Sequence, residues 1–177
     1  MYNRFFLYFC TPIYVICYMS EVRNYIRLPL RDLEESSHTF DFSVDTEFFS
    51  DFQNFEIIES SMEIFLKVEK FSHFMDVVLT FSGILTVSCD RCLEEFELPV
   101  EGENLLSVRF GETPEEPENE SPVEDVMYVN AEDEEIDLTV YVYESICLAL
   151  PIQRVHGDDE NGNSLCNPRM LKYIMNR

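Results

Sequence analysis

Apolar and polar residues alternate with period two through the middle of the chain, which is typical of strands with one buried face. In residues 62–70, four apolar side chains alternate with polar ones. In residues 75–89 the pattern is longer, and only Gly83 interrupts it, which indicates a bend or bulge. Residues 96–100 and 106–110 predict two further strands. The connections are too short for parallel crossovers, so we expect an antiparallel meander. One face of the longest strand should then be apolar (Val77, Leu79, Phe81, Leu85 and Val87).

The flanking regions add less regular elements. Residues 25–30 predict a short edge strand, because Pro29 has no N–H to donate to a neighbouring strand. Residues 31–54 are mixed, and the acidic and aromatic residues around 45–52 predict one or two helical turns. Residues 138–150 carry an apolar stripe at helical spacing; Asp137 is the expected N-cap, and Pro151 ends the helix.

These elements predict an α+β fold in a single domain over residues 22–167. Its sheet is expected to be antiparallel and either curved or barrel-like, with one C-terminal helix at 138–150. Residues 168–177 are expected to form a C-terminal tail. At 177 residues, the chain is long enough to bury a core without disulfide bonds.

The charge is strongly acidic, with 35 Asp and Glu against 12 Lys and Arg, for a formal net charge of −23. Residues 112–137 hold 12 acidic residues and three prolines but no Lys or Arg, which predicts a mobile acidic loop with a brief strand at 126–129. This loop either keeps the chain soluble or docks a basic partner. The acidity opposes direct nucleic-acid binding, which needs clustered Lys and Arg.

The first 21 residues differ from the rest. Residues 5–18 are apolar and aromatic, but they are too short to span a membrane and lack the small-residue pattern of a secretory signal. We expect Met19 to be the true start, with residues 1–18 read from an upstream start, and we expect residues 1–21 as a whole to be a non-native or disordered leader. A signal anchor or a docking segment is the alternative. The expected location is the cytoplasm, with no membrane association.

Cysteine spacing gives the main candidate for chemistry. Cys89 and Cys92 form a C-x-x-C at the turn between two predicted strands, where both sulfurs can reach one ion. Zinc prefers four ligands, and His156 and Cys166 follow the predicted helix. A Cys3His zinc site from Cys89, Cys92, His156 and Cys166 is therefore one hypothesis. Reduced free thiols and a redox pair are the others, although the strand context lacks the helix N-terminus of thioredoxin-like motifs.

Signs of catalysis are few. The sequence has no G-x-S-x-G, no P-loop and no G-x-G-x-x-G motif. His38 and His73 are isolated, and Cys147 is most simply a small core residue. A Cys–His nucleophile pair from Cys166 and His156 is conceivable, but nothing in the sequence supplies a third orienting group. We therefore do not expect an enzyme; a thiol-dependent hydrolase or a redox enzyme is the rival hypothesis.

Several segments, taken in order, resemble one known family. C-x-R-C-L-E-x-F-x-x-P-V runs from Cys89 to Val100, and L-x-x-x-F-G-E runs from Leu106 to Glu112. After the acidic stretch come E-I-D-L, ending at Leu138, and E-S-I-C-L-A-L-P-I, ending at Ile152. This order resembles the YceD family, the large ribosomal RNA subunit accumulation proteins, over roughly residues 22–166.

The resemblance implies a non-enzymatic factor that supports accumulation of 23S ribosomal RNA and assembly of the 50S subunit. Together with the acidity, it predicts a basic ribosomal protein or a pre-50S particle as the partner. Cys89, Cys92 and Cys166 match family cysteines and His156 matches more loosely, while Asn161-Gly162-Asn163 stands where many relatives have a further cysteine. The alternative is a zinc-stabilised protein-interaction module in an unrelated complex.

Overall fold

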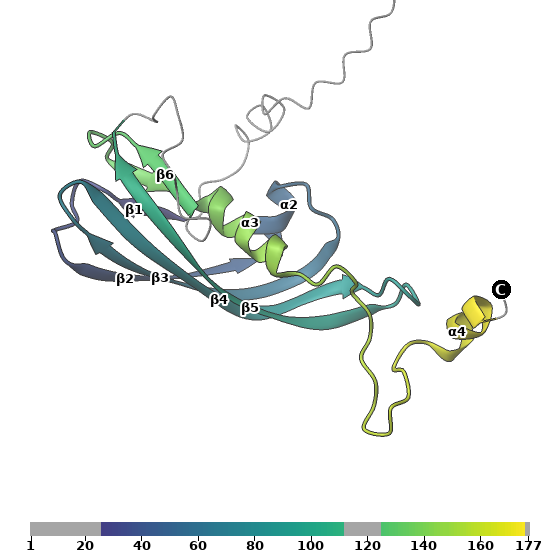
Figure 1. Cartoon of the computed structure of the whole chain (residues 1–177). Coiled ribbons are helices and arrows are strands. Elements are labelled where there is room, and N and C mark those ends of the chain that lie inside the picture. The colour runs from purple at the N-terminus through teal and green to yellow at the C-terminus, as the bar shows by residue number, and fades with distance from the viewer. Residues whose placement is uncertain (1–25, 112–124, 176–177) are drawn as a thin grey trace, which may run out of the picture.

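The structure of the chain is a computed structural model that describes residues 26–111 and 125–175 (Figure 1). The expected leader, residues 1–21, lies outside the described residues. So does the first half of the expected acidic loop, residues 112–124.

The main element is a five-stranded sheet with the order β2-β3-β4-β5-β6. β2 (Ser37–Asp45), β3 (Ile57–Lys70), β4 (Phe74–Ser88) and β5 (Glu95–Phe110) form the antiparallel meander that the alternation predicts. β6 (Asp125–Val129) pairs with β5 in parallel, so the expectation of a wholly antiparallel sheet is wrong. β2 and β6 are edge strands and do not pair with each other, so the sheet is open and the barrel-like alternative is also wrong.

Two details of the strands differ from the sequence-based expectation. β5 is one continuous strand, although its sequence predicts two. No bulge occurs at Gly83: the β3–β4 register is regular there, and the one irregularity lies between Ile57 and Glu59. Glycine is instead required by packing, because a Cβ atom on Gly83 would lie 2.2 Å from the Ser61 carbonyl oxygen.

A separate two-stranded sheet pairs the first described strand with the segment before α3 (Thr139–Ala149). β1 (Arg27–Pro29) lies where the sequence predicts a short edge strand, and it pairs with β7 (Glu135–Asp137). Both β6 and β7 fall within residues 112–137, so that range is not one continuous loop. The expected brief strand at 126–129 is confirmed as β6.

Three helices are described: α2 (Thr46–Asp51), α3 (Thr139–Ala149) and α4 (Pro168–Met175). α2 confirms the helical turns predicted around 45–52, α3 is the predicted C-terminal helix, and α4 lies in the range expected to be a tail. α3 begins one residue later than expected, so its N-cap is Leu138 and not the predicted Asp137. The Asp137 carboxylate still accepts a hydrogen bond from the Thr139 N–H at 2.9 Å. α2 and α3 lie on the same side of the sheet in Figure 1, and the stacked rings of Phe52 and Tyr143, 3.9 Å apart, join them.

The core lies between one face of the sheet, which we call the inner face, and the helices α2 and α3. The inward-facing apolar residues of β3 and β4 are buried there, including the predicted Val77, Leu79 and Phe81. α3 adds Val142 and Ile146 to the same cluster. The sheet is therefore buried on one face only, which explains the strict alternation of its sequence.

The opposite face, which we call the outer face, consists of the outward positions of β2 to β5. No described helix or strand covers it in Figure 1. Cations occupy two of its positions among the described residues, Lys67 and Arg109. The acidic residues at outward positions are far more numerous: Asp41, Asp45, Glu59, Glu63, Glu69, Asp76, Glu95, Glu97, Glu101 and Glu103.

Candidate metal centre

The turn between β4 and β5 folds into a compact knuckle that holds two sulfurs close together. The Cys89 N–H donates to the Glu94 carbonyl at 2.8 Å, and the Leu93 N–H donates back to the Cys89 carbonyl at 2.8 Å. Leu93 adopts a left-handed backbone with φ of 63°, which lets the chain reverse within the turn. Cys89 and Cys92 are both buried, so the C-x-x-C forms the hairpin knuckle that its spacing predicts.

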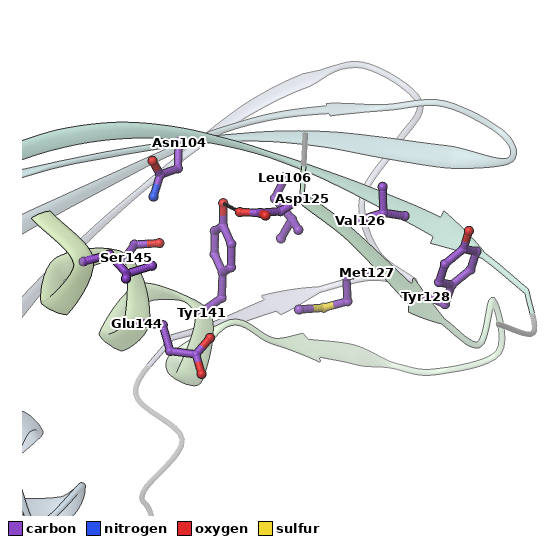
Figure 2. Close-up of a pocket in the computed structure, with 10 residues that line it drawn as sticks. Asn104, Leu106, Asp125, Val126, Met127, Tyr128, Tyr141, Glu144 and Ser145 are labelled. Atoms are coloured by element: carbon purple, nitrogen blue, oxygen red, sulfur yellow. Dashed lines mark hydrogen bonds between the residues drawn. The ribbon is translucent and has the colours of Figure 1, made fainter. Parts of the chain in front are cut away.

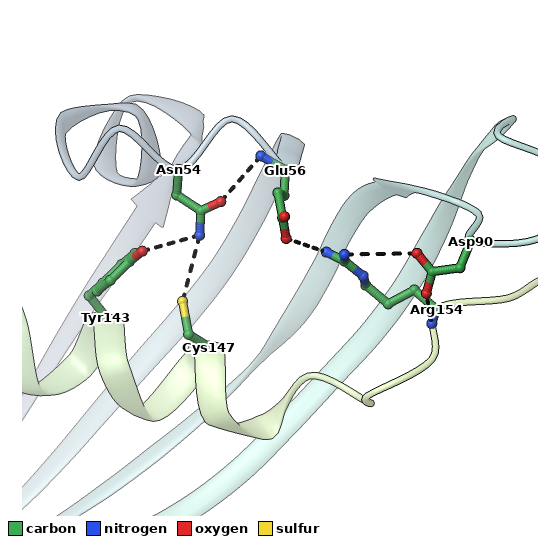
Figure 3. A network of polar contacts seen from close by, with 6 residues as sticks. All are labelled: Asn54, Glu56, Asp90, Tyr143, Cys147 and Arg154. Carbon is green, nitrogen blue, oxygen red and sulfur yellow. Dashed lines mark hydrogen bonds and ion pairs between the residues drawn. The ribbon is translucent and has the colours of Figure 1, made fainter.

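The segment after α3 is held beside this knuckle by Arg154. The Asp90 N–H donates to the Arg154 carbonyl at 2.7 Å, and the Arg154 N–H donates to the Asp90 carboxylate at 2.7 Å. The guanidinium of Arg154 also donates to Glu56 at 2.9 Å (Figure 3). These contacts fix the backbone two residues before His156. The sequence pattern does not point to Arg154, because its partners lie 64 and 98 positions away.

A second part of the same network holds α3 to the turn before β3. The Asn54 amide donates to the Tyr143 hydroxyl at 3.2 Å and to the Cys147 sulfur at 3.7 Å (Figure 3). Burial raises the pKa of the Cys147 thiol, so the uncharged form is favoured. Cys147 is only half-buried and is not among the buried core residues, so the prediction of a core position is wrong.

The four predicted ligands come together in one cluster. Cys89 and Cys92 lie in the knuckle, while His156 and Cys166 come from the C-terminal segment. All their ligand atoms lie within 4.8 Å of one another. The Sγ atoms of Cys89 and Cys166 are 3.7 Å apart, and Cys92 Sγ lies 3.4 Å from His156 Nδ1. His38 and His73 are not part of this cluster.

These distances fit a tetrahedral metal ion. Zinc–sulfur bonds of about 2.3 Å and zinc–nitrogen bonds of about 2.0–2.1 Å place two sulfurs about 3.8 Å apart, and a sulfur and a nitrogen about 3.5 Å apart. The observed separations are close to both values. A disulfide needs sulfurs about 2.0 Å apart, so the cysteines are free thiols. Three sulfurs and one imidazole nitrogen are also a donor set typical of structural zinc. The cluster could therefore hold a metal ion.

Backbone N–H groups surround one of the sulfurs. Burial of Cys89 raises its pKa, but hydrogen bonds from the N–H groups of Cys92, His156 and Arg91 oppose this effect and bring the pKa to about 6. Such bonds favour the thiolate, which is the form that binds metal. At Cys166 a bond from Ser164 lowers the pKa, but burial and the neighbouring Cys89 and Cys92 outweigh it and leave the pKa raised.

Apolar side chains pack around the cluster and shield it from solvent. Phe96 packs against it from β5, with its ring 4.8 Å from the imidazole of His156. α4, within the range predicted to be a tail, adds Met170 and Leu171. As a result Cys89, Cys92 and Cys166 are between 0% and 2% exposed. A buried four-ligand arrangement resembles structural metal sites, since catalytic sites keep one position open to substrate.

A second feature is a pocket of about 510 Å³ between β6 and α3 (Figure 2). Its walls include Met127 and Leu148, with Asp125 and Glu144 as acidic residues. The Tyr141 hydroxyl donates to Asp125 at 3.4 Å. Burial, together with the charge of Asp125 and the hydrogen bond to it, raises the pKa of Tyr141 to about 12. The folded protein therefore favours the neutral phenol.

Comparison with known proteins identifies the family. Residues 77–170, just over half of the chain, match the family described as Large ribosomal RNA subunit accumulation protein YceD. The chain belongs to the YceD family. The matched region runs from β4 through the first residues of α4, so it contains all four residues of the cluster.

The YceD match is narrower than the resemblance seen in the sequence, since it leaves out β1, β2, α2 and β3. No curated protein and no solved structure matches this YceD chain. Within the described residues, no helix is long and apolar enough to cross a membrane.

Proposed function

We propose that this YceD protein is a non-enzymatic ribosome-biogenesis factor. It supports accumulation of 23S ribosomal RNA and assembly of the 50S subunit in the cytoplasm, and it acts by binding a basic ribosomal protein. The family match over residues 77–170 carries this proposal, because the family is described by large ribosomal RNA subunit accumulation.

The charge of the chain supports a basic protein as the direct partner. A net charge of −23 repels RNA phosphates and attracts Lys-rich and Arg-rich surfaces. Opposite charge speeds such an encounter and makes it dependent on salt. Ribosomal RNA accumulates when its basic proteins load correctly, so an acidic factor can act on RNA levels without contacting RNA.

The cluster of Cys89, Cys92, His156 and Cys166 has a structural role in this proposal. It binds one zinc ion, which fixes the C-terminal segment and α4 to the β4–β5 hairpin. Burial supports this role over a thiol-dependent hydrolase or a redox enzyme, because a substrate has no route to sulfurs that are at most 2% exposed.

A strain that lacks the gene tests the proposed function. We expect its ribosome gradient to show fewer 50S subunits, and its 23S RNA to fall relative to 16S RNA. Complementation with the wild-type gene should restore both. Cys92→Ser should restore them incompletely, because the protein loses its zinc, whereas Cys147→Ser is the matched control on α3.

An unchanged gradient and an unchanged 23S level would remove the ribosomal proposal. The remaining hypothesis would then be a zinc-stabilised interaction module in an unrelated complex. Full complementation by Cys92→Ser would show instead that the zinc site is not needed for the ribosomal role.

A further inference from the structure

The outer face has a regular arrangement of charge around its central strand. Among the outward residues of β4, Val78, Thr80 and Ser82 have short side chains. β3 and β5 lie on either side and carry longer acidic ones. In one row Glu63 and Glu101 flank Ser82, and in the next row Glu103 lies beside Thr80. Carboxylates therefore border Ser82 on both sides and Thr80 on one side, while Val78 lies between Lys67 and Leu105.

These carboxylates are spaced for contact with several cationic side chains. Strands lie about 4.8 Å apart, so Glu63 and Glu101 are separated by about 10 Å across β4, and Glu101 and Glu103 by about 7 Å along β5. Among the described residues, these glutamates do not form a group that could hold a metal ion. Their spacing is close enough for mutual repulsion, because the Debye length is about 8 Å at physiological salt.

The two cations on the outer face do little to relieve this repulsion. Lys67 is paired with Glu69 at 2.8 Å, and Arg109 lies at the far end of β5 with an interaction of its own. Glu69 also faces Asp76 directly across β3 and β4, a like-charge pair that destabilises a sheet. The outer face thus carries an electrostatic cost in the isolated protein, and a positively charged partner would remove it.

Apolar side chains on the same face indicate a protein partner. Phe65 on β3 is 40% exposed, Ile84 on β4 is 47% exposed and Leu105 on β5 is 38% exposed. They lie among the carboxylates, at outward positions of the same three strands. A metal cation gains nothing from them, whereas a protein segment can bury them while its Lys and Arg side chains reach the acidic residues.

We infer that the outer face is the docking surface for a basic protein segment, which lies along β4 with its cationic side chains on Glu63, Glu101 and Glu103. This rests on the proposed function, in which the partner is a basic ribosomal protein. The charge disfavours two other occupants, because RNA phosphates and the outer face of a second copy would both be repelled.

The test uses the full chain and basic proteins of the large ribosomal subunit, purified one by one and free of RNA. Binding is measured at low and at physiological salt, together with binding to 23S RNA fragments. One variant carries Glu63→Gln, Glu101→Gln and Glu103→Gln. The matched control carries Glu34→Gln, Glu35→Gln and Glu160→Gln, which remove the same charge from exposed residues elsewhere. Carbodiimide cross-linking then identifies which carboxylates contact the partner.

We expect at least one ribosomal protein to bind. The outer-face variant should bind it about tenfold or more weakly, the control should bind almost as the wild type does, and the cross-links should map to β3 and β5. Equal loss in both variants would overturn the inference, because net charge alone would then explain binding. Unchanged binding in both would overturn it while leaving the proposed function intact. Wild-type binding to RNA but to none of the proteins would overturn both proposals.

Discussion

The sulfurs of Cys89 and Cys166 lie 3.7 Å apart although 77 positions separate the two residues in the chain. This contact depends on two features that act together. The hairpin knuckle places the Cys89 side chain against the C-terminal segment. Arg154 holds that segment in place through its hydrogen bonds with Asp90. Substitutions of the four cluster residues should therefore affect metal binding, whereas substitution of Arg154 should affect the position of the C-terminal segment.

Zinc content is the most direct consequence of the cluster. Protein purified without chelators should carry about one zinc per chain, since three sulfurs and one nitrogen form a complete tetrahedral set. Cys92→Ser should lower this value to well below half, because the remaining three ligands leave the ion open to water. Cys147→Ser should leave it unchanged, since Cys147 contacts Asn54 and not the cluster. Metal analysis of the three proteins decides the matter, and a metal-free wild type would refute the zinc site.

Removal of the metal should release the C-terminal segment. We expect a chelator to increase amide hydrogen exchange in residues 153–171, because binding free energy at such a site stabilises the local fold. Exchange in the centre of β3 and β4 should change little, since their core residues contact α2 and α3. Arg154→Met should raise exchange in the same segment even with zinc bound, because Asp90 and Glu56 lose their guanidinium contacts. Equal protection with and without chelator would contradict a metal-held segment.

The sequence predicts the local parts of this fold better than the distant ones. β3 and β4 follow directly from period-two alternation, because one face of the sheet is buried and the other is not. The same signal was available for β2, where His38, Phe40, Phe42 and Val44 alternate with polar residues, but the many aromatics obscured it. The alternation does not predict β5 as one continuous strand, because Gly102 and Asn104 occupy inner positions normally filled by large apolar residues.

Contacts between distant segments could not be predicted in this way. The parallel pairing of β6 with β5 depends on how the chain crosses between them, which no local pattern encodes. At the candidate site, ligand chemistry pointed to Cys89, Cys92, His156 and Cys166. The packing of Met170 and Leu171 against them was missed, because a short amphipathic segment after Pro168 has no signal that indicates what it covers.

Two glycines in the sheet should be intolerant of a side chain. A Cβ atom at Gly102 would lie 2.4 Å from the buried Phe81 ring, and one at Gly83 would meet the backbone at Ser61. Alanine at either position should cost about 1–3 kcal/mol of unfolding free energy, with Gly83→Ala the more severe because backbone yields less than a ring. Gly157→Ala is the control, since nothing lies within 4 Å of its Cβ position. Urea unfolding measures all three, and a neutral Gly83→Ala would contradict the packing seen here.

The Tyr141 phenol should lose its proton at a higher pH than an ordinary tyrosine does. Its pKa is raised to about 12, first by burial and then by Asp125, whereas an unfolded tyrosine titrates near 10. The raised value means that the folded protein favours the neutral phenol, so this contribution to stability is complete below pH 10 and is lost as the pH rises towards 12. The difference in phenolate absorbance between wild type and Tyr141→Phe isolates this group. Asp125→Asn should lower the midpoint but leave it above 10, because burial remains; a wild-type midpoint at 10 would contradict the pocket geometry.

Salt should stabilise the isolated protein, because the outer face repels itself. The Debye length falls from about 30 Å at 0.01 M salt to about 8 Å at 0.15 M, which screens contacts such as Glu63 to Glu101. We therefore expect the thermal midpoint to rise over this range. One variant carries Glu63→Gln, Glu101→Gln and Glu103→Gln, and the control carries Glu34→Gln, Glu35→Gln and Glu160→Gln. The rise in the thermal midpoint should be smaller in the first variant than in the control, because only the first removes Glu63 and Glu101, which face each other across β4. Thermal unfolding followed by circular dichroism at both salt concentrations compares the three proteins. Equal salt dependence in the two variants would mean that the repulsion comes from net charge and not from the outer face.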